Sequence, residues 1–236
     1  MEKLLLLMFV VTLPISGFTQ DLSSGELLEK AIAYHDPEDQ WSTFQGNFQV
    51  IMDSPDRPKR KSAIILDFPL SYFKLTAERA GTTTTFLLEE DSCSLLLNER
   101  KDFTAEEAKA NQLSCERAHL MKDYYTYLYG LPMKLKDPGT KLDPVVQKKK
   151  FKGKDYLVLR VTYDQEVGED TWYFYFNPET YAMEVYQFFH DESKNDGEYI
   201  LLEGEELIQD IRMPKVRAWY YNKDDVYLGT DTLYGN

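Results

Sequence analysis

The fold is decided by residues 44–53, which read FQGNFQVIMD. Apolar or small residues alternate there with polar ones, and the first set is Phe44, Gly46, Phe48, Val50 and Met52. Because successive side chains of a β-strand point to opposite faces, this alternation predicts a strand with one buried face and one wet face. The turn residues Asp53-Ser54-Pro55-Asp56 then predict a return along a second strand.

The same alternation recurs on both sides of a helical middle section. A capping box at Ser23 and Glu26 begins a first helix, Thr104 caps a second, and residues 114–129 form a third. Short turns separate the strands, which is typical of antiparallel meanders. We therefore expect a mainly β (α+β) protein. Its strands would form a large curled antiparallel sheet rather than a parallel α/β fold.

Residues 1–19 are typical of a cleavable export signal. Lys3 precedes the apolar stretch from Leu4 to Ile15, which is too short to span a bilayer, and small residues stand at Gly17 and Thr19. We predict cleavage before Gln20 and one domain over residues 20–236. The protein would then be periplasmic or secreted and not integral to the membrane; an uncleaved single-pass anchor is the alternative.

The charge balance excludes one class of partner. The chain has 40 acidic and 27 basic residues and a formal net charge of −13. A surface of this sign repels phosphate backbones, so we expect no nucleic-acid partner.

The two cysteines, Cys93 and Cys115, form a candidate disulfide in an oxidising compartment. Such a bridge would add about 3 kcal/mol of stability through the unfolded state. Two buried free thiols are the alternative. The spacing does not suit zinc, which needs more ligands nearby.

The sequence contains no recognised catalytic or phosphate-binding motif. Its three histidines, His35, His119 and His190, fall in different predicted elements. A hydrolase-type site would need His35 or His190 to meet acids across a cleft. Residues 191–198 carry oxygen side chains that resemble a calcium loop, but Lys194 interrupts them and favours an exposed hairpin. We therefore assign no catalytic residue, no metal site and no cofactor.

Aromatic residues make up 14% of the chain. They indicate either a sheet packed on both faces or an apolar groove that could hold an acyl chain. The candidate ligand-binding residues on clean apolar faces are Phe48, Val50, Met52, Met121, Tyr125, Leu157 and Leu159. All seven could equally be core.

Four segments carry a resemblance to a known family. They are residues 33–37 with Trp41, residues 129–135, residues 170–176 with 187–190, and residues 213–222. In these segments the chain resembles an uncharacterised family of secreted Bacteroidota proteins, a domain of unknown function. In element order it resembles the periplasmic lipoprotein-carrier superfamily with the LolA-like fold. This resemblance implies an open antiparallel half-barrel of about 11–12 strands, with the N-terminal helix and the mid-chain helix pair covering the concave face. The resemblance implies fold better than function, and no residue role is carried over.

The sequence thus favours a non-enzymatic exported binding protein, carrying a lipid or a lipidated protein in an apolar half-barrel cavity. One alternative is an envelope interaction or structural module without a small ligand. The other is an unrecognised hydrolase-type enzyme.

Overall fold

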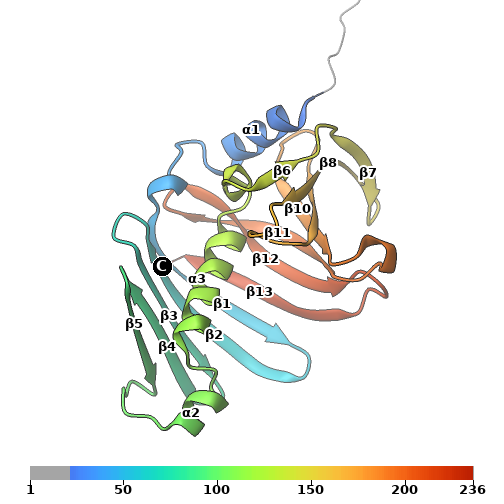
Figure 1. Cartoon of the computed structure of the whole chain (residues 1–236). Coiled ribbons are helices and arrows are strands. Elements are labelled where there is room, and N and C mark those ends of the chain that lie inside the picture. Colours follow the sequence, from blue (N-terminus) through green and yellow to red (C-terminus); the bar gives the residue numbers. More distant parts are fainter. Residues whose placement is uncertain (1–21, 236) are drawn as a thin grey trace, which may run out of the picture.

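A computed structural model describes residues 22–235 of the chain, which form one curved antiparallel sheet with helices in its hollow (Figure 1). The predicted signal segment 1–19 lies outside the described residues. The first meander contains β1 (Gln45–Ser54), β2 (Arg57–Asp67), β3 (Tyr72–Arg79), β4 (Thr82–Glu89) and β5 (Ser92–Leu97). The helices are α1 (Ser24–His35), α2 (Ala105–Ala110) and α3 (Cys115–Tyr129).

The second meander returns the chain to the first. Its strands are β6 (Thr140–Leu142), β7 (Gln147–Phe151), β8 (Lys154–Tyr163), β9 (Thr171–Phe176), β10 (Met183–Phe189), β11 (Glu198–Ile208), β12 (Ile211–Tyr221) and β13 (Tyr227–Gly235). Short 3-10 helices lie at η1 (Trp41–Thr43), η2 (Met133–Lys136) and η3 (Glu192–Lys194). Strand β13 pairs with β1, so the two meanders form one sheet in the order β5-β4-β3-β2-β1-β13-β12-β11-β10-β9-β8-β6, with β7 also pairing with β8.

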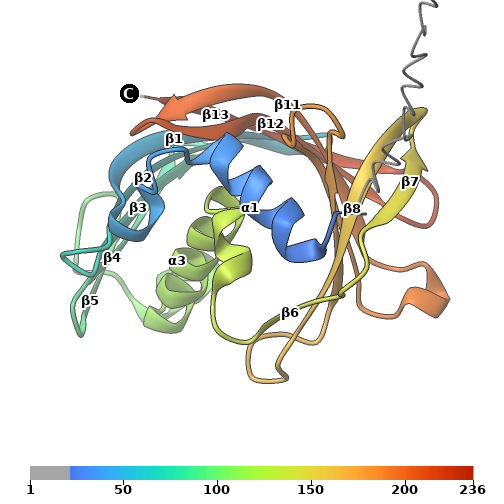
Figure 2. The ribbon, with the colours of Figure 1, turned by 90° about the horizontal axis from the view of Figure 1, so that it is seen from above.

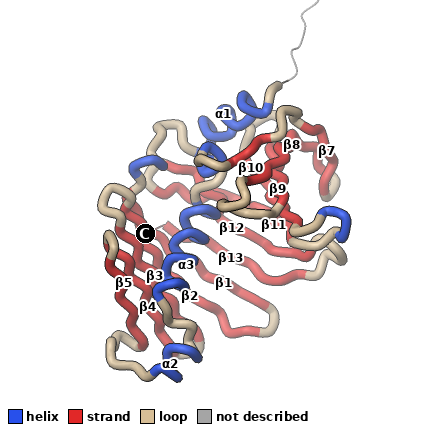
Figure 3. The backbone as a smooth tube through the Cα atoms, in the orientation of Figure 1, coloured by secondary structure: helices blue, strands red, loops and turns tan. Residues whose placement is uncertain are grey.

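This order explains why α2 and α3 lie in the hollow. Strand β5 is one edge of the sheet and β6 lies at the other, and the chain between them contains only the two helices and η2. The connection therefore crosses the concave face, as the tube in Figure 3 shows. Seen from above, the sheet curves around both α1 and α3 (Figure 2).

The expected fold class is confirmed: the sheet is antiparallel, open and covered by helices on its concave face. The described residues hold thirteen strands, slightly more than expected, because β6 and β7 were not among the predicted strands. Strand β6 has three residues, and β7 carries Lys148, Lys149 and Lys150. Charged edge strands lack a strong apolar alternation, although lysine suits an edge because it discourages further pairing.

The aromatic strands are packed on both faces. Trp172, Phe174 and Phe176 of β9 face the main core between the sheet and the helices, whereas Tyr173 and Tyr175 belong to a second cluster on the convex face. The β7 residue Phe151 covers this second cluster, with its ring centroid 5.2 Å from that of Tyr175. The aromatic content of these strands is therefore explained by packing.

Candidate functional site

A crevice opens at one end of the concave face, between β2–β4 and the α2–α3 turn. Its volume is about 410 Å³, within the range of small-molecule sites. Leu75, Ala77 and Phe86 line it from the sheet, and Met121 lines it from α3. Three further lining residues are cationic: Arg60, Arg79 and Arg117. We call these seven residues the arginine crevice.

Side-chain size explains why the crevice lies at this end. The paired strands place Thr84 opposite Ala77 and Ala77 opposite Ser62, so the sheet carries small side chains beneath the first half of α3. Two residues further along the strands, Leu75 pairs with Phe86 and with Ile64, and large side chains fill the space. The strands and the helix are continuous between these two places, so residue volume decides which one stays open.

A row of five residues, four of them charged, crosses the concave face from the crevice. Arg79 lies opposite Arg60, and Arg60 lies opposite Met52. Met52 in turn lies opposite Asp231, and Asp231 opposite Arg217. The row therefore leads from the crevice into the closed interior beneath α3. Arg217 and Asp231 are buried, whereas Arg60 and Arg79 are only half-buried.

The arginines of the crevice are not neutralised by close ion pairs, although the charge of Arg60 acts on the buried carboxyl of Asp231. Among residues 22–235, none of Arg60, Arg79 and Arg117 forms an ion pair with a carboxylate. The Nη2 atom of Arg79 lies 3.8 Å from the Met52 sulfur. Burial, Arg60 and Arg57 together lower the pKa of Arg79. The crevice thus concentrates positive charge in a strongly acidic protein.

The buried part of the row fixes α3 to the sheet. The Arg217 guanidinium lies over the Tyr129 ring at 4.0 Å and donates hydrogen bonds to the carbonyls of Pro214 and Leu128. Leu128 is in the last turn of α3, where a cation also offsets the negative end of the helix dipole. Burial raises the pKa of Asp231, and the charges of Arg60 and Arg217 oppose that rise.

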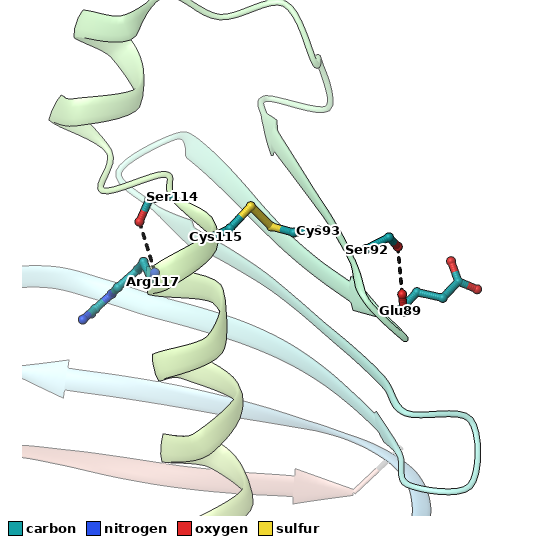
Figure 4. Close-up of a disulfide and its surroundings, with 6 residues drawn as sticks. All are labelled: Glu89, Ser92, Cys93, Ser114, Cys115 and Arg117. Carbon is teal, nitrogen blue, oxygen red and sulfur yellow. Dashed lines mark hydrogen bonds between the residues drawn. A yellow bond between two sulfur atoms is a disulfide. The ribbon is translucent and has the colours of Figure 1, made fainter.

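A disulfide fixes the other end of α3. Cys115 is the first residue of the helix and is bonded to Cys93 of the edge strand β5, with 5.9 Å between their Cα atoms (Figure 4). Arg117 extends from the same helical turn on the side away from the disulfide. Both ends of the helix that roofs the hollow are therefore attached to the sheet.

The seven predicted ligand-binding residues do not lie together in one cavity. Phe48, Val50, Tyr125 and Leu159 are closed within the main core, where the Phe48 and Tyr129 ring centroids are 5.0 Å apart. Leu157 is half-buried on β8, far along the sheet from β2–β4. Met121 lines the arginine crevice and Met52 contacts Arg79 beside it. Only a ligand in the crevice would reach these two methionines without displacing α3.

The sequence reasoning missed the three arginines of the crevice. A signal was present, since Arg60 and Arg79 stand in phase with Ile64 and Leu75 on the buried faces of their strands. Arginine on an otherwise apolar strand face is uncommon and points to a special environment. Their convergence, however, depends on strand register and on α3.

His35 and Asp36 have structural partners. The His35 ring is buried, with Nδ1 2.6 Å from the Arg212 carbonyl oxygen and Nε2 3.0 Å from the Met183 amide nitrogen. The ring is neutral in this arrangement: Nδ1–H donates and Nε2 accepts, and burial lowers its pKa. Asp36 accepts hydrogen bonds from the amides of Gln40 and Trp41. The segment therefore attaches α1 to β10 and β12 and orders η1.

Trp41 fixes the chain where α3 ends. A Cβ atom added at Gly130 would lie 2.2 Å from a ring carbon of Trp41, so the indole packs directly on a glycine backbone. This close approach requires glycine at the start of the segment 130–135. Two of the segments that carry the family resemblance thus meet in a packing contact.

The remaining histidines do not face a shared cleft. His190 Nδ1 lies 2.6 Å from a carboxylate oxygen of Asp170 at an exposed position, and this contact raises the pKa of His190. His119 is exposed on α3. Residues 22–235 contain no cluster of three or more His, Cys, Asp or Glu side chains placed to hold a metal ion. In the same part of the chain, none of the helices is long and apolar enough to cross a bilayer.

The chain belongs to the family of unknown function DUF6503, whose profile matches residues 3–236. No curated protein matches it significantly. Among solved structures it is similar to a LolA superfamily protein from Nitrosomonas europaea, with a TM-score of 0.51, 12% identity, and coverage of 90% of this chain and 91% of that one.

Two further solved structures are similar to a lesser degree. A putative outer membrane lipoprotein-sorting protein domain from Vibrio parahaemolyticus has a TM-score of 0.45 and 11% identity, with 89% of each chain covered. A DUF1329 family protein from Desulfovibrio piger has a TM-score of 0.48 and 11% identity, with 89% of this chain and 90% of that one covered. The assignment of a LolA-like fold rests on the Nitrosomonas protein, and at this identity it extends to the fold alone.

Proposed function

We propose that this protein is a non-enzymatic, exported binding protein that carries a lipid or a lipidated protein by an apolar chain. The observation that carries the proposal is the open crevice between sheet and helices, whose apolar lining includes the buried Leu75 and Phe86 and the half-buried Met121. Burial of an acyl chain against such side chains supplies affinity without any reactive group. The predicted signal segment at residues 1–19 and the LolA-like fold support an extracytoplasmic role.

The ligand occupies the crevice and leaves the rest of the hollow unchanged. Phe48, Val50, Tyr125 and Leu159 already fill the space beneath the second half of α3. Opening that space would require α3 to leave the sheet, while Arg217 and the disulfide hold its two ends. We therefore place the apolar chain against Met121 and Met52 rather than across all seven predicted residues.

A pair of substitutions on β3 tests this proposal. Ala77→Trp places an indole in the crevice, whereas the matched control Thr76→Trp places one on the opposite face of the strand. Native mass spectrometry of the protein incubated with monoolein should show a bound lipid in the wild type and in the control. The Ala77→Trp variant should lose it. Equal lipid occupancy in both variants, or failure of the wild type to bind a lipid of any headgroup, would contradict the proposal.

An interaction module is the second candidate, favoured by an exposed apolar patch. Tyr221, Val226 and Tyr227 are exposed at the turn between β12 and β13. The Tyr220 and Tyr227 ring centroids lie 5.4 Å apart beside them. Exposed aromatic groups of this kind are typical of protein contact sites. If this patch carried the function, the Tyr227→Ser variant would lose its activity in the cell. The Ala77→Trp variant, whose crevice is filled, would keep full activity.

A further inference from the structure

The lining of the arginine crevice has the opposite charge to the protein as a whole. The chain carries a formal net charge of −13, yet the crevice is lined by three arginines and by no aspartate or glutamate. Two of these arginines, Arg60 and Arg79, are direct cross-strand partners. Like charges placed opposite each other destabilise a sheet, so an anion bound between the two arginines would stabilise the pair. The buried carboxyl of Asp231 interacts with Arg60, but from the other side of Met52.

The guanidinium groups also have unused hydrogen-bond donors. The Nε atoms of Arg60 and Arg79 are buried and have no hydrogen-bond partner. A guanidinium carries five N–H donors in a fixed planar arrangement that matches the oxygens of carboxylate and phosphate groups. Arg117 adds a third guanidinium from the roof, on α3. Three donor groups from two layers thus surround one opening.

The apolar residues lie further along the same strand. Ala77 and Leu75 lie two and four residues before Arg79, on the same face of β3. Phe86 of β4 pairs with Leu75. The crevice is therefore cationic at the end of the strand and apolar further in. This gradient suits an amphiphile with an anionic head and an apolar tail.

We propose that the crevice selects single-chain amphiphiles with an anionic headgroup, a carboxylate or a phosphate, bound by Arg60, Arg79 and Arg117. This inference rests on the proposed function, because it specifies the headgroup of the chain that the crevice holds. The tail contacts Leu75, Phe86 and Met121, and the headgroup accepts hydrogen bonds from the arginines. Hydrogen bonds to charged groups in a partly desolvated site are strong enough to govern the choice of ligand.

Isothermal titration with four probes tests the proposal: oleate, 1-oleoyl lysophosphatidate, monoolein and inorganic phosphate. Oleate and lysophosphatidate separate carboxylate from phosphate recognition, and monoolein is the neutral reference. At least one anionic amphiphile should bind about tenfold or more tightly than monoolein, the gain expected from charged hydrogen bonds. Added salt should reduce this difference, because ions screen an exposed charge contact.

Substitutions then assign the effect to the arginines. Arg79→Gln should abolish the preference for the anionic lipid over monoolein, and Arg117→Gln should weaken that preference. Lys61→Gln is the matched control, because Lys61 neighbours Arg60 on β2 and points to the opposite, exposed face. Thermal unfolding of each variant reports whether it is folded. Since Arg117 lies on the helix, its variant tests the site without altering the sheet.

Each outcome separates the headgroup inference from the proposed function. Equal binding of monoolein and the anionic lipids overturns the inference and leaves carriage intact. Failure of every lipid to bind overturns both. Binding of inorganic phosphate as tightly as lysophosphatidate overturns the amphiphile assignment, because the tail would then add nothing.

Discussion

The two ends of the concave face differ although one sheet and one helix form both. Beneath the end of α3, Phe48 stacks near Tyr129, and Trp41 packs on Gly130. Beneath the start of α3, Ala77 and Thr84 leave space and arginines border it. We refer to these as the packed end and the open end. Changing side-chain volume along continuous strands is thus sufficient to produce a scaffold at one end and a binding site at the other.

Removing one large side chain from each end tests the difference in packing between the two ends most directly. Phe48→Ala at the packed end should lower the free energy of unfolding by about 3–5 kcal/mol, because it removes a fully buried ring. Met121→Ala at the open end should lower it by about 1 kcal/mol or less, since its side chain is half-buried beside a space. Urea unfolding measures both. Equal losses would mean that the ends are packed alike.

Removing the disulfide tests how the first turn of α3 is attached to the sheet at the open end. Replacing both Cys93 and Cys115 by alanine should lower the free energy of unfolding by about 3 kcal/mol, through the larger entropy of the unfolded chain. Hydrogen exchange should rise most in the first turn of α3, while amides near Tyr129 stay protected. Two titratable thiols in the native, oxidised protein, or uniform exchange along α3, would contradict this account.

The pH dependence of stability tests the structural role of His35, whose buried ring attaches α1 to β10 and β12. Burial lowers the pKa of His35 in the folded protein, so below about pH 6.5 the unfolded chain binds a proton that the folded chain does not. Stability is therefore present above the unfolded pKa and is lost as the pH falls, by at most about 1.4 kcal/mol per pH unit from this residue. Unfolding of wild type and His35→Gln between about pH 7.5 and about pH 5.5, one unit to each side of the ordinary histidine pKa, measures it. If the free energy of unfolding changed with pH in the same way in both proteins, His35 would have its ordinary pKa and this account would be wrong.

The smallest effect is expected at His190, outside both ends. Its contact with Asp170 is an exposed ion pair, so His190→Gln should change stability by no more than about 0.5 kcal/mol. Proton NMR should show a raised pKa for His190 that returns toward its ordinary value in Asp170→Asn. A loss of stability comparable with that of Phe48→Ala would mean that this surface pair belongs to the core.

Local patterns in the sequence were sufficient to predict most helices and strands and the antiparallel sheet, whereas the half-barrel form was implied by the family resemblance. The alternation at residues 44–53 and the capping boxes at Ser23 and Thr104 each report on neighbours within a few positions. Strands β6 and β7 were missed because three residues and a run of lysines give no such pattern.

The candidate site could be predicted only in part. Met121 and Met52 were named from their apolar faces, and they lie at the crevice or beside it. The arginines come from β2, β3 and α3, and only pairing and helix placement bring them together. The polar row through Asp231 and Arg217 likewise depends on the pairing of β13 with β1 and β12, which no local pattern encodes.

The most direct test of the account uses methionine methyl groups labelled with ¹³C and observed by NMR during titration with oleate. Met121 lines the crevice and Met52 lies beside Arg79, whereas Met133, Met183 and Met213 are buried in the packed core. We predict that the Met121 signal shifts most and Met52 less, with the three core signals unchanged. Shifts at Met183 and Met213 with Met121 unchanged, or no shift at saturating oleate, would contradict a binding site at the open end.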